Sequence, residues 1–193
     1  MPRIFIIIFN GLLSLVIAAI ALSVIVVPFL PELIYEETGD VEIENIVQET
    51  RKTHKEEIRE NFLLIPKIRV ASIINEGDSY LALDQGAWRR PLASNPKEGG
   101  NTVIVAHRFL SGMQERSFYH LPKLVVGDEI YIYWDNEEYV YEVFETRTVE
   151  PYDKEIEDNS DEPILTLYTC TPLWTSDKRF VVLAKPKLIE ETI

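Results

Sequence analysis

Hydrophobic side chains are distributed in two different ways along this chain, and the first is an unbroken run near the amino terminus. Residues 4–30 contain no charged side chain, and Asn10, Ser14 and Ser23 are their clearly polar interruptions. A helix of about 20 apolar residues crosses the hydrocarbon core of a bilayer, whereas the apolar part of a cleavable signal peptide spans roughly 7 to 15. The pattern therefore predicts a membrane anchor over residues 1–31 that is retained rather than cleaved.

The charges that flank this run predict its orientation. Arg3 and the amino terminus lie on one side, and acidic residues from Glu32 to Asp40 lie on the other. Positively charged flanks stay on the cytoplasmic side of a membrane. We therefore expect a single-pass protein of the plasma membrane, anchored in its lipid, with a cytoplasmic amino terminus and the remainder of the chain outside the cell.

The stretch that follows is highly charged but retains some apolar periodicity. Within residues 36–61, Ile43, Ile46, Val47 and Ile58 recur roughly at helical spacing. A polar helix with so few apolar positions is typical of a solvated connector. We expect residues 32–62 to form a charged, helical stalk.

From residue 63 onward the second distribution begins, in which short apolar runs alternate with turn residues. This pattern is typical of an all-β domain, expected here over residues 63–193, with a helical turn near residues 117–125. The pair Asp135 and Asn136 favours a hairpin turn. No crossover helix of useful length separates the strands, which favours a barrel rich in antiparallel pairs. The expected strand regions are residues 63–74, 80–83, 101–107, 129–134, 138–150, 164–169 and 179–185.

Composition narrows the functional classes. Hydrophobic residues make up 46% of the 193 residues, which is sufficient for one folded domain with a core, and the net charge is −13. An acidic chain of this kind has no electrostatic attraction for nucleic acid phosphates, so nucleic acid is not an expected partner.

The chain contains a single cysteine, Cys170, and an exported free thiol requires a reason. Side chains alternate along residues 164–170, which places Leu165 and Leu167 on one face and Cys170 on the other, more polar face. If Arg179 opens the next strand of a hairpin, it lies opposite Cys170.

These residue types are suited to acyl transfer. A nearby cation favours the thiolate form of a cysteine, which is the nucleophile. The reaction also needs a proton donor for the leaving amine and a donor for the oxyanion, and His107 and Arg179 could supply them. Residue type alone leaves a structural interpretation open, because a lone cysteine is most often a small buried apolar residue.

Several motifs resemble those of the sortases, the membrane-anchored cysteine transpeptidases of bacterial surfaces. TLYTCTP at residues 166–172, followed by Arg179, resembles the family's active-site signature. Ala106 stands where sortases often have Gly, and Lys178 stands where some members have His, which leaves the subclass open. The other similar segments are LLIPKIRV at residues 63–70, GNTVIVAHR at 100–108 and FYHLPKLVVGDEI at 118–130.

The resemblance covers roughly residues 63–186 and implies a closed sortase-type β-barrel of about eight strands with short helices. It implies exported substrate proteins with a carboxy-terminal LPXTG-like sorting motif, and an amine acceptor on a cell-wall precursor or a pilin. Cys170 would form a thioacyl-enzyme, His107 would act as acid and then base, and Arg179 would bind the substrate backbone and oxyanion. His120 competes with His107, but it lies in the expected helical turn.

Further residues are assigned more loosely. Thr169 and Trp174 are candidate substrate contacts, and Asn101 or Asp128 could orient the imidazole. The resemblance implies no obligatory cofactor. Some sortases use calcium to order a loop, and oxygen ligands suit that ion, but the acidic residues before the Cys170 strand match no defined calcium motif. Those residues are Glu155, Glu157, Asp158, Asp161 and Glu162.

The subclass is predicted from a missing element. Pilus-building sortases often carry a lid with an Asp-Pro-aromatic element, and residues 36–61 contain no proline. Attachment of surface proteins to the cell envelope is therefore the expected function, with pilin polymerisation as an alternative. A thiol peptidase that passes the acyl group to water and a non-catalytic surface binding module are the remaining alternatives.

Overall fold

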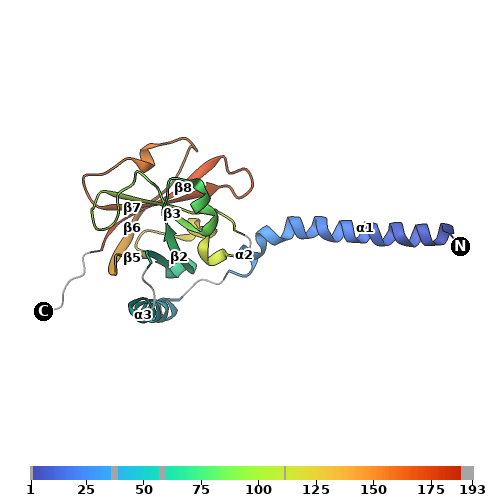
Figure 1. Ribbon diagram of the computed structural model, residues 1–193, viewed down its shortest axis with the longest axis horizontal. Coiled ribbons are helices and arrows are strands. Elements are labelled where there is room, and N and C mark those ends of the chain that lie inside the picture. Colours follow the sequence, from blue (N-terminus) through green and yellow to red (C-terminus); the bar gives the residue numbers. More distant parts are fainter. Residues whose placement is uncertain (1, 36–38, 57–59, 111, 188–193) are drawn as a thin grey trace. The chain divides into compact units, whose positions relative to one another are not determined.

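The computed structural model describes residues 2–35, 39–56, 60–110 and 112–187, which divide into two compact units (Figure 1). The first unit, Met1–Glu36, contains α1 (Pro2–Val26), η1 (Val27–Phe29) and α2 (Leu30–Leu33). The segment Arg3–Leu33 is long and apolar enough to cross a membrane, and none of it is buried within the protein. A helix that is apolar on all sides needs an apolar environment. The predicted helix is confirmed, and its orientation stays a prediction.

The second unit, Glu37–Ile193, contains a closed barrel with strand order β1-β2-β3-β4-β7-β8-β6-β5 (Figure 1). Two of its strand pairs are parallel, β2 with β3 and β4 with β7, and the others are antiparallel. The predicted barrel of about eight strands is confirmed. The strands are β1 (Phe62–Ile65), β2 (Val70–Asn75), β3 (Ala87–Arg89), β4 (Asn101–Val105), β5 (Glu129–Trp134), β6 (Glu137–Val149), β7 (Ile164–Thr171) and β8 (Lys178–Pro186).

Short 3-10 helices fill the connections between strands. Asp135 and Asn136, between β5 and β6, both have positive φ values of 50° and 65°, as a tight hairpin turn requires. The predicted hairpin and the helical turn near residues 117–125 are both confirmed. The 3-10 helices are η2 (Pro66–Ile68), η3 (Tyr80–Gln85), η4 (Gln114–Arg116), η5 (Leu121–Lys123) and η6 (Glu155–Glu157).

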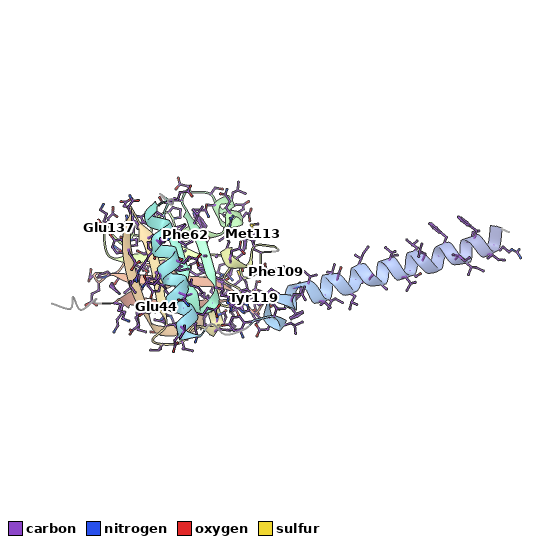
Figure 2. The ribbon with its side chains drawn as sticks, turned by 90° about the horizontal axis from the view of Figure 1, so that it is seen from below. Glu44, Phe62, Phe109, Met113, Tyr119 and Glu137 are labelled. Carbon is purple, nitrogen blue, oxygen red and sulfur yellow. The ribbon has the colours of Figure 1, made fainter. Side chains whose placement is uncertain are left out.

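Helix α3 (Asp40–Glu56) confirms the predicted helix but not its solvation. It lies across the outer face of the barrel, where Glu44 marks it in Figure 2. Val47 is 1% exposed and packs with Leu64, Tyr131 and Tyr133. The few apolar side chains of the helix are thus sufficient to cover one patch of β1 and β5, so the expectation of a fully solvated stalk is wrong. Ile58 lies outside the described residues.

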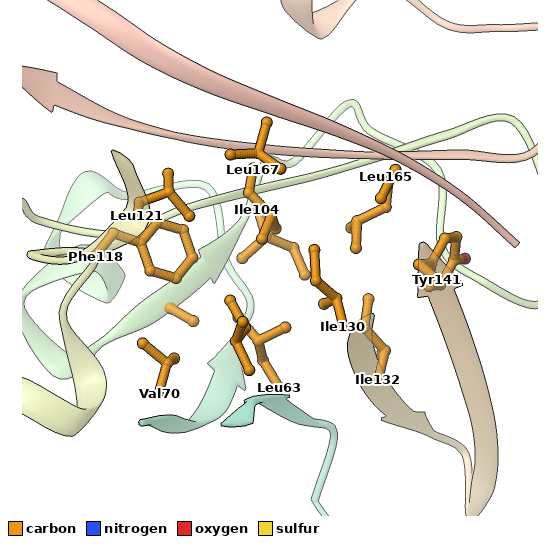
Figure 3. Close-up of a cluster of buried hydrophobic side chains, with 14 of the residues drawn as sticks. Leu63, Val70, Ile104, Phe118, Leu121, Ile130, Ile132, Tyr141, Leu165 and Leu167 are labelled. Atoms are coloured by element: carbon orange, nitrogen blue, oxygen red, sulfur yellow. The ribbon is translucent and has the colours of Figure 1, made fainter. Parts of the chain in front are cut away.

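The barrel core is formed by the inward side chains of alternate strand positions. Figure 3 shows Leu165 and Leu167 of β7 beside Ile104 of β4, facing residues of β1 and β5. Phe118 and Leu121, from the β4–β5 connection, belong to the same cluster. This confirms the face assigned to Leu165 and Leu167 and directs the intervening residues of β7 outward.

Two predicted strand regions differ in the structure. Residues 63–74 form two strands, because Pro66 has no amide donor and starts η2, after which Arg69 adopts a left-handed conformation with φ 53°. Residues 80–83 are wrong as a strand, since they belong to η3, where the Ser79 hydroxyl accepts a hydrogen bond from Leu81 N at 3.3 Å. This local cap competes with strand formation.

Candidate functional site

Cys170 lies near the end of β7, between the parallel neighbour β4 and the antiparallel neighbour β8. Its backbone pairs in register with that of Arg179, as the sequence predicted. Tyr168, two positions earlier, belongs to a cluster on the outer face of the barrel. Because side chains alternate along a strand, Cys170 faces outward as well, and it is half-buried.

His107 follows the end of β4, beside the same stretch of β7. The parallel register pairs Val105 with Tyr168, and continuing it by two residues brings His107 next to Cys170. The two strand ends are joined by a hydrogen bond that the Thr169 hydroxyl donates to Ala106 O at 2.8 Å. The fold thus brings the Cys170, His107 and Arg179 segments together, while their catalytic roles stay predictions.

The Arg179 guanidinium is tied to its own loop. Nη1 donates to Ser176 O at 3.0 Å and to Lys178 O at 2.9 Å. The loop folds back on itself, because Ser176 N donates to Pro172 O at 3.0 Å. Trp174 lies on this loop and is 57% exposed, and its substrate contact stays a prediction. The guanidinium is therefore held at the edge of the strand that faces Cys170.

Thr169 links the two strand ends, and its contact with a substrate stays a prediction. The residue is fully buried, and its hydroxyl is used in the contact with Ala106 O. It therefore ties β7 to β4. The buried hydrogen bond fixes the relative position of the two strand ends that carry Cys170 and His107.

Asp84 is a site residue that sequence reasoning missed. Its Oδ1 lies 3.1 Å from His107 Nε2, whereas Asn101 donates to the carbonyls of Ile156 and Asp158 and Asp128 accepts from Val125 N. Neither predicted partner of the imidazole therefore has that contact. Sequence reasoning missed Asp84 because the residues just before it were interpreted as a strand. The capping residue Ser79 was the signal that could have indicated a short helix there.

Two other residues flank the candidate site. Arg108 Nη1 donates to Thr171 Oγ1 at 3.5 Å, and its guanidinium lies 5.7 Å from the centre of the Tyr119 ring. His120, the competing histidine, precedes η5 and contacts the Tyr119 ring edge-on at 4.9 Å. Only His107 of these two histidines continues a strand that pairs with β7.

The β6–β7 connection is fastened to the outer face beside the site. Glu157 Oε1 accepts hydrogen bonds from Arg90 Nε at 2.9 Å and from the Tyr168 hydroxyl at 2.5 Å. Burial first, and then the neighbouring Glu157 carboxylate, raise the pKa of Tyr168 well above its usual range, so the phenol remains a neutral donor. Ile156 is 4% exposed within the outer cluster.

The acidic residues of this connection do not converge on a metal site. Glu157 is engaged by Arg90 and Tyr168, and Glu155, Asp158 and Asp161 do not join it in a cluster. Within the described ranges, no group of three or more His, Cys, Asp or Glu side chains is arranged to hold a metal ion. The calcium loop considered from the sequence therefore finds no support in the geometry.

Comparisons with known proteins agree with this architecture. The sortase domain model matches residues 63–187, whereas a sequence search among curated proteins finds no significant match. Sortase A of Listeria monocytogenes is 26% identical, with a TM-score of 0.59 over 66% of this chain and 86% of that one. The sortase D5 transpeptidase of Clostridium perfringens is 29% identical, with a TM-score of 0.59 over 72% and 88%.

A pilus-related sortase C of Group B Streptococcus is also similar, at 28% identity and a TM-score of 0.60 over 67% of each chain. These solved structures represent three classes of the family. Because the family model covers more than half of the chain and the barrel carries Cys170, His107 and Arg179 on adjoining segments, the chain belongs to the sortase family of transpeptidases.

Proposed function

We propose that this protein is a cysteine transpeptidase of the bacterial plasma membrane that cleaves an LPXTG-like sorting motif in exported proteins. It joins the released acyl group to an amine and so attaches surface proteins to the cell envelope. The observation that carries this proposal is the pairing of Cys170 with Arg179, with His107 at the end of the adjoining parallel strand.

In the first step, Cys170 Sγ attacks the carbonyl carbon of the motif's threonine and the peptide C–N bond breaks. The His107 imidazolium gives its proton to the leaving amine, and Arg179 donates to the oxyanion. The products are a thioacyl-enzyme and the released downstream peptide. Covalent catalysis divides a difficult exchange into two easier steps.

In the second step, an incoming amine attacks the thioacyl carbonyl. His107, now neutral, takes the proton from the amine nitrogen, and the C–S bond breaks to return the Cys170 thiolate. The enzyme ends in its starting state, so neither oxidant nor reductant is consumed.

The position of α3 supports cell-envelope attachment as the first choice. This helix packs against β1 and β5, which lie across the closed strand order from β7. The described part of the segment where pilus-building members often have a lid is therefore remote from Cys170. A pilin amine is the second candidate acceptor, because one similar structure is described as pilus-related.

The test uses the full chain in detergent micelles with a library of labelled sorting peptides, with and without hydroxylamine as a small amine. We expect a thioacyl adduct on the wild-type chain, an amine-dependent transfer product, and neither with Cys170→Ala. Hydrolysis alone at high hydroxylamine concentration would identify a thiol peptidase. A Cys170→Ala strain with an unchanged surface phenotype would identify a non-catalytic binding module.

A further inference from the structure

Asp84 reaches His107 from an element whose position is firmly set. The preceding residues of η3, Ala82 and Leu83, pack against the outer cluster. The next turn depends on Gly86, whose φ is +134° and where an added Cβ would lie 2.6 Å from Ser72 Oγ. Ser72 is 1% exposed, so this close approach leaves no room for a side chain. The backbone that carries Asp84 is therefore held from both sides.

The contact with Asp84 distinguishes the two nitrogens of the imidazole. Asp84 Oδ1 lies 3.1 Å from Nε2, and an ionised carboxylate can only accept a hydrogen bond. The neutral ring carries its single proton on one nitrogen, and the partner of that nitrogen decides which one it is. Asp84 thus favours the tautomer with hydrogen on Nε2 and leaves Nδ1 as the basic nitrogen.

We propose that Asp84 is a positioning residue that holds His107 through Nε2, so that Nδ1 exchanges protons with the substrate amines. This inference rests on the proposed transpeptidase function. In acylation the Nδ1 proton passes to the leaving amine nitrogen as its C–N bond breaks. In the second step a proton from the incoming amine returns to Nδ1 as the C–S bond to Cys170 breaks. Asp84 keeps its own charge throughout.

The expected effect is moderate, because both partners are accessible to water. The side chains of His107 and Asp84 are 37% and 63% exposed, and water weakens an exposed ion pair. A contact of this kind changes the equilibrium constant between the oriented ring and its other orientations by about fivefold at most. Asp84 therefore differs from the reacting groups, whose removal abolishes turnover.

The test compares Asp84→Ala, Asp84→Asn and Asp78→Ala in the full chain in detergent micelles. Asp78 is an exposed carboxylate two residues before η3 begins at Tyr80, and it serves as the control for lost charge in the same connection. We expect Asp84→Ala to lower kcat about fivefold with little change in KM. Asp84→Asn retains an acceptor oxygen and should restore most of kcat, and Asp78→Ala should match the wild type.

Nitrogen-15 spectra of the His107 ring give a readout that does not depend on turnover. The neutral wild-type ring should carry hydrogen on Nε2, and Asp84→Ala should shift the ring towards a mixture of tautomers. The proposal is overturned if the wild-type ring carries hydrogen on Nδ1, or if Asp84→Ala and Asp78→Ala have the same kcat. If the wild type transfers no acyl group, the transpeptidase proposal fails, and the ring spectra still decide whether Asp84 orients His107.

Discussion

At the scale of single residues, the candidate site combines one pairing that local pattern predicted and one contact that it did not. The opposition of Cys170 and Arg179 follows from strand alternation and hairpin pairing. The contact between Asp84 and His107 joins two connections that are not neighbours in sequence. The side chains at the strand ends also need loops that orient them. The loop before β8 does this for Arg179, whose guanidinium donates to two of its carbonyls.

A prediction at this scale concerns the shape of the Arg179 side chain. Arg179→Lys keeps the charge but loses the planar fork that can bind loop carbonyls and substrate together. We expect kcat/KM for a sorting peptide to fall about 100-fold, the typical cost of one oxyanion donor, with unchanged thermal stability. Arg147→Lys on β6, half-exposed beside Glu145, is the matched control. Equal activity of the two variants would contradict a role for the guanidinium.

At the scale of elements, the β6–β7 connection behaves as part of the barrel surface. Glu157 is held by Arg90 of the β3–β4 connection and by Tyr168 of β7. Arg90 also lies 4.6 Å above the Trp88 ring. The strand that carries Cys170 is thus linked to the acidic connection by a hydrogen-bonded network, where sequence reasoning saw an acidic loop that could bind calcium.

The prediction at this scale is energetic coupling between Arg90 and Glu157. The two side chains are 31% and 32% exposed, so we expect a coupling free energy of only about 1 kcal/mol in a double-mutant cycle. Arg90→Gln and Glu157→Gln should each speed hydrogen exchange of residues 153–160 and raise KM. Glu155→Gln, an exposed change on the same 3-10 helix, should do neither. If the two substitutions have strictly additive effects on the free energy of unfolding, the contact between Arg90 and Glu157 does not stabilise the connection.

At the scale of the whole molecule, barrel closure decides which chain segments become neighbours. The parallel pairing of β4 with β7 places the end of β4 beside Cys170, and β8 completes the site from the other side. Helix α3 adds to the folded unit by covering a patch of β1 and β5. The Arg51 side chain fastens it further, with contacts of 2.9 and 2.7 Å to Glu138.

The prediction at this scale is that α3 contributes to barrel stability. Val47→Ala removes two buried carbon atoms from a site that is 1% exposed, and we expect the free energy of unfolding to fall by about 2 kcal/mol. Val41→Ala, on the same helix at 78% exposure, should have almost no effect. Urea unfolding of the full chain in micelles measures both. Equal values would indicate that α3 is not part of the cooperative unit.

Most of the fold could be predicted because its signals are local. An uncharged apolar run specifies a long helix, alternation specifies the inner face of β7, and Asp135 with Asn136 specifies a hairpin turn. The segment around Tyr80 was misinterpreted because a capped 3-10 turn and a short strand share the same apolar pattern. The motif around Cys170 was sufficient to indicate the family.

The sequence by itself determined the apolar helix, most of the individual strands and the opposition of Cys170 and Arg179, since each depends on residues close together in the chain. Only the tertiary structure decided the burial of Thr169, the packing of α3 and the partner of His107. These features arise where segments distant in sequence meet. Side-chain periodicity indicates which face of an element is apolar, but it does not indicate which other element covers that face.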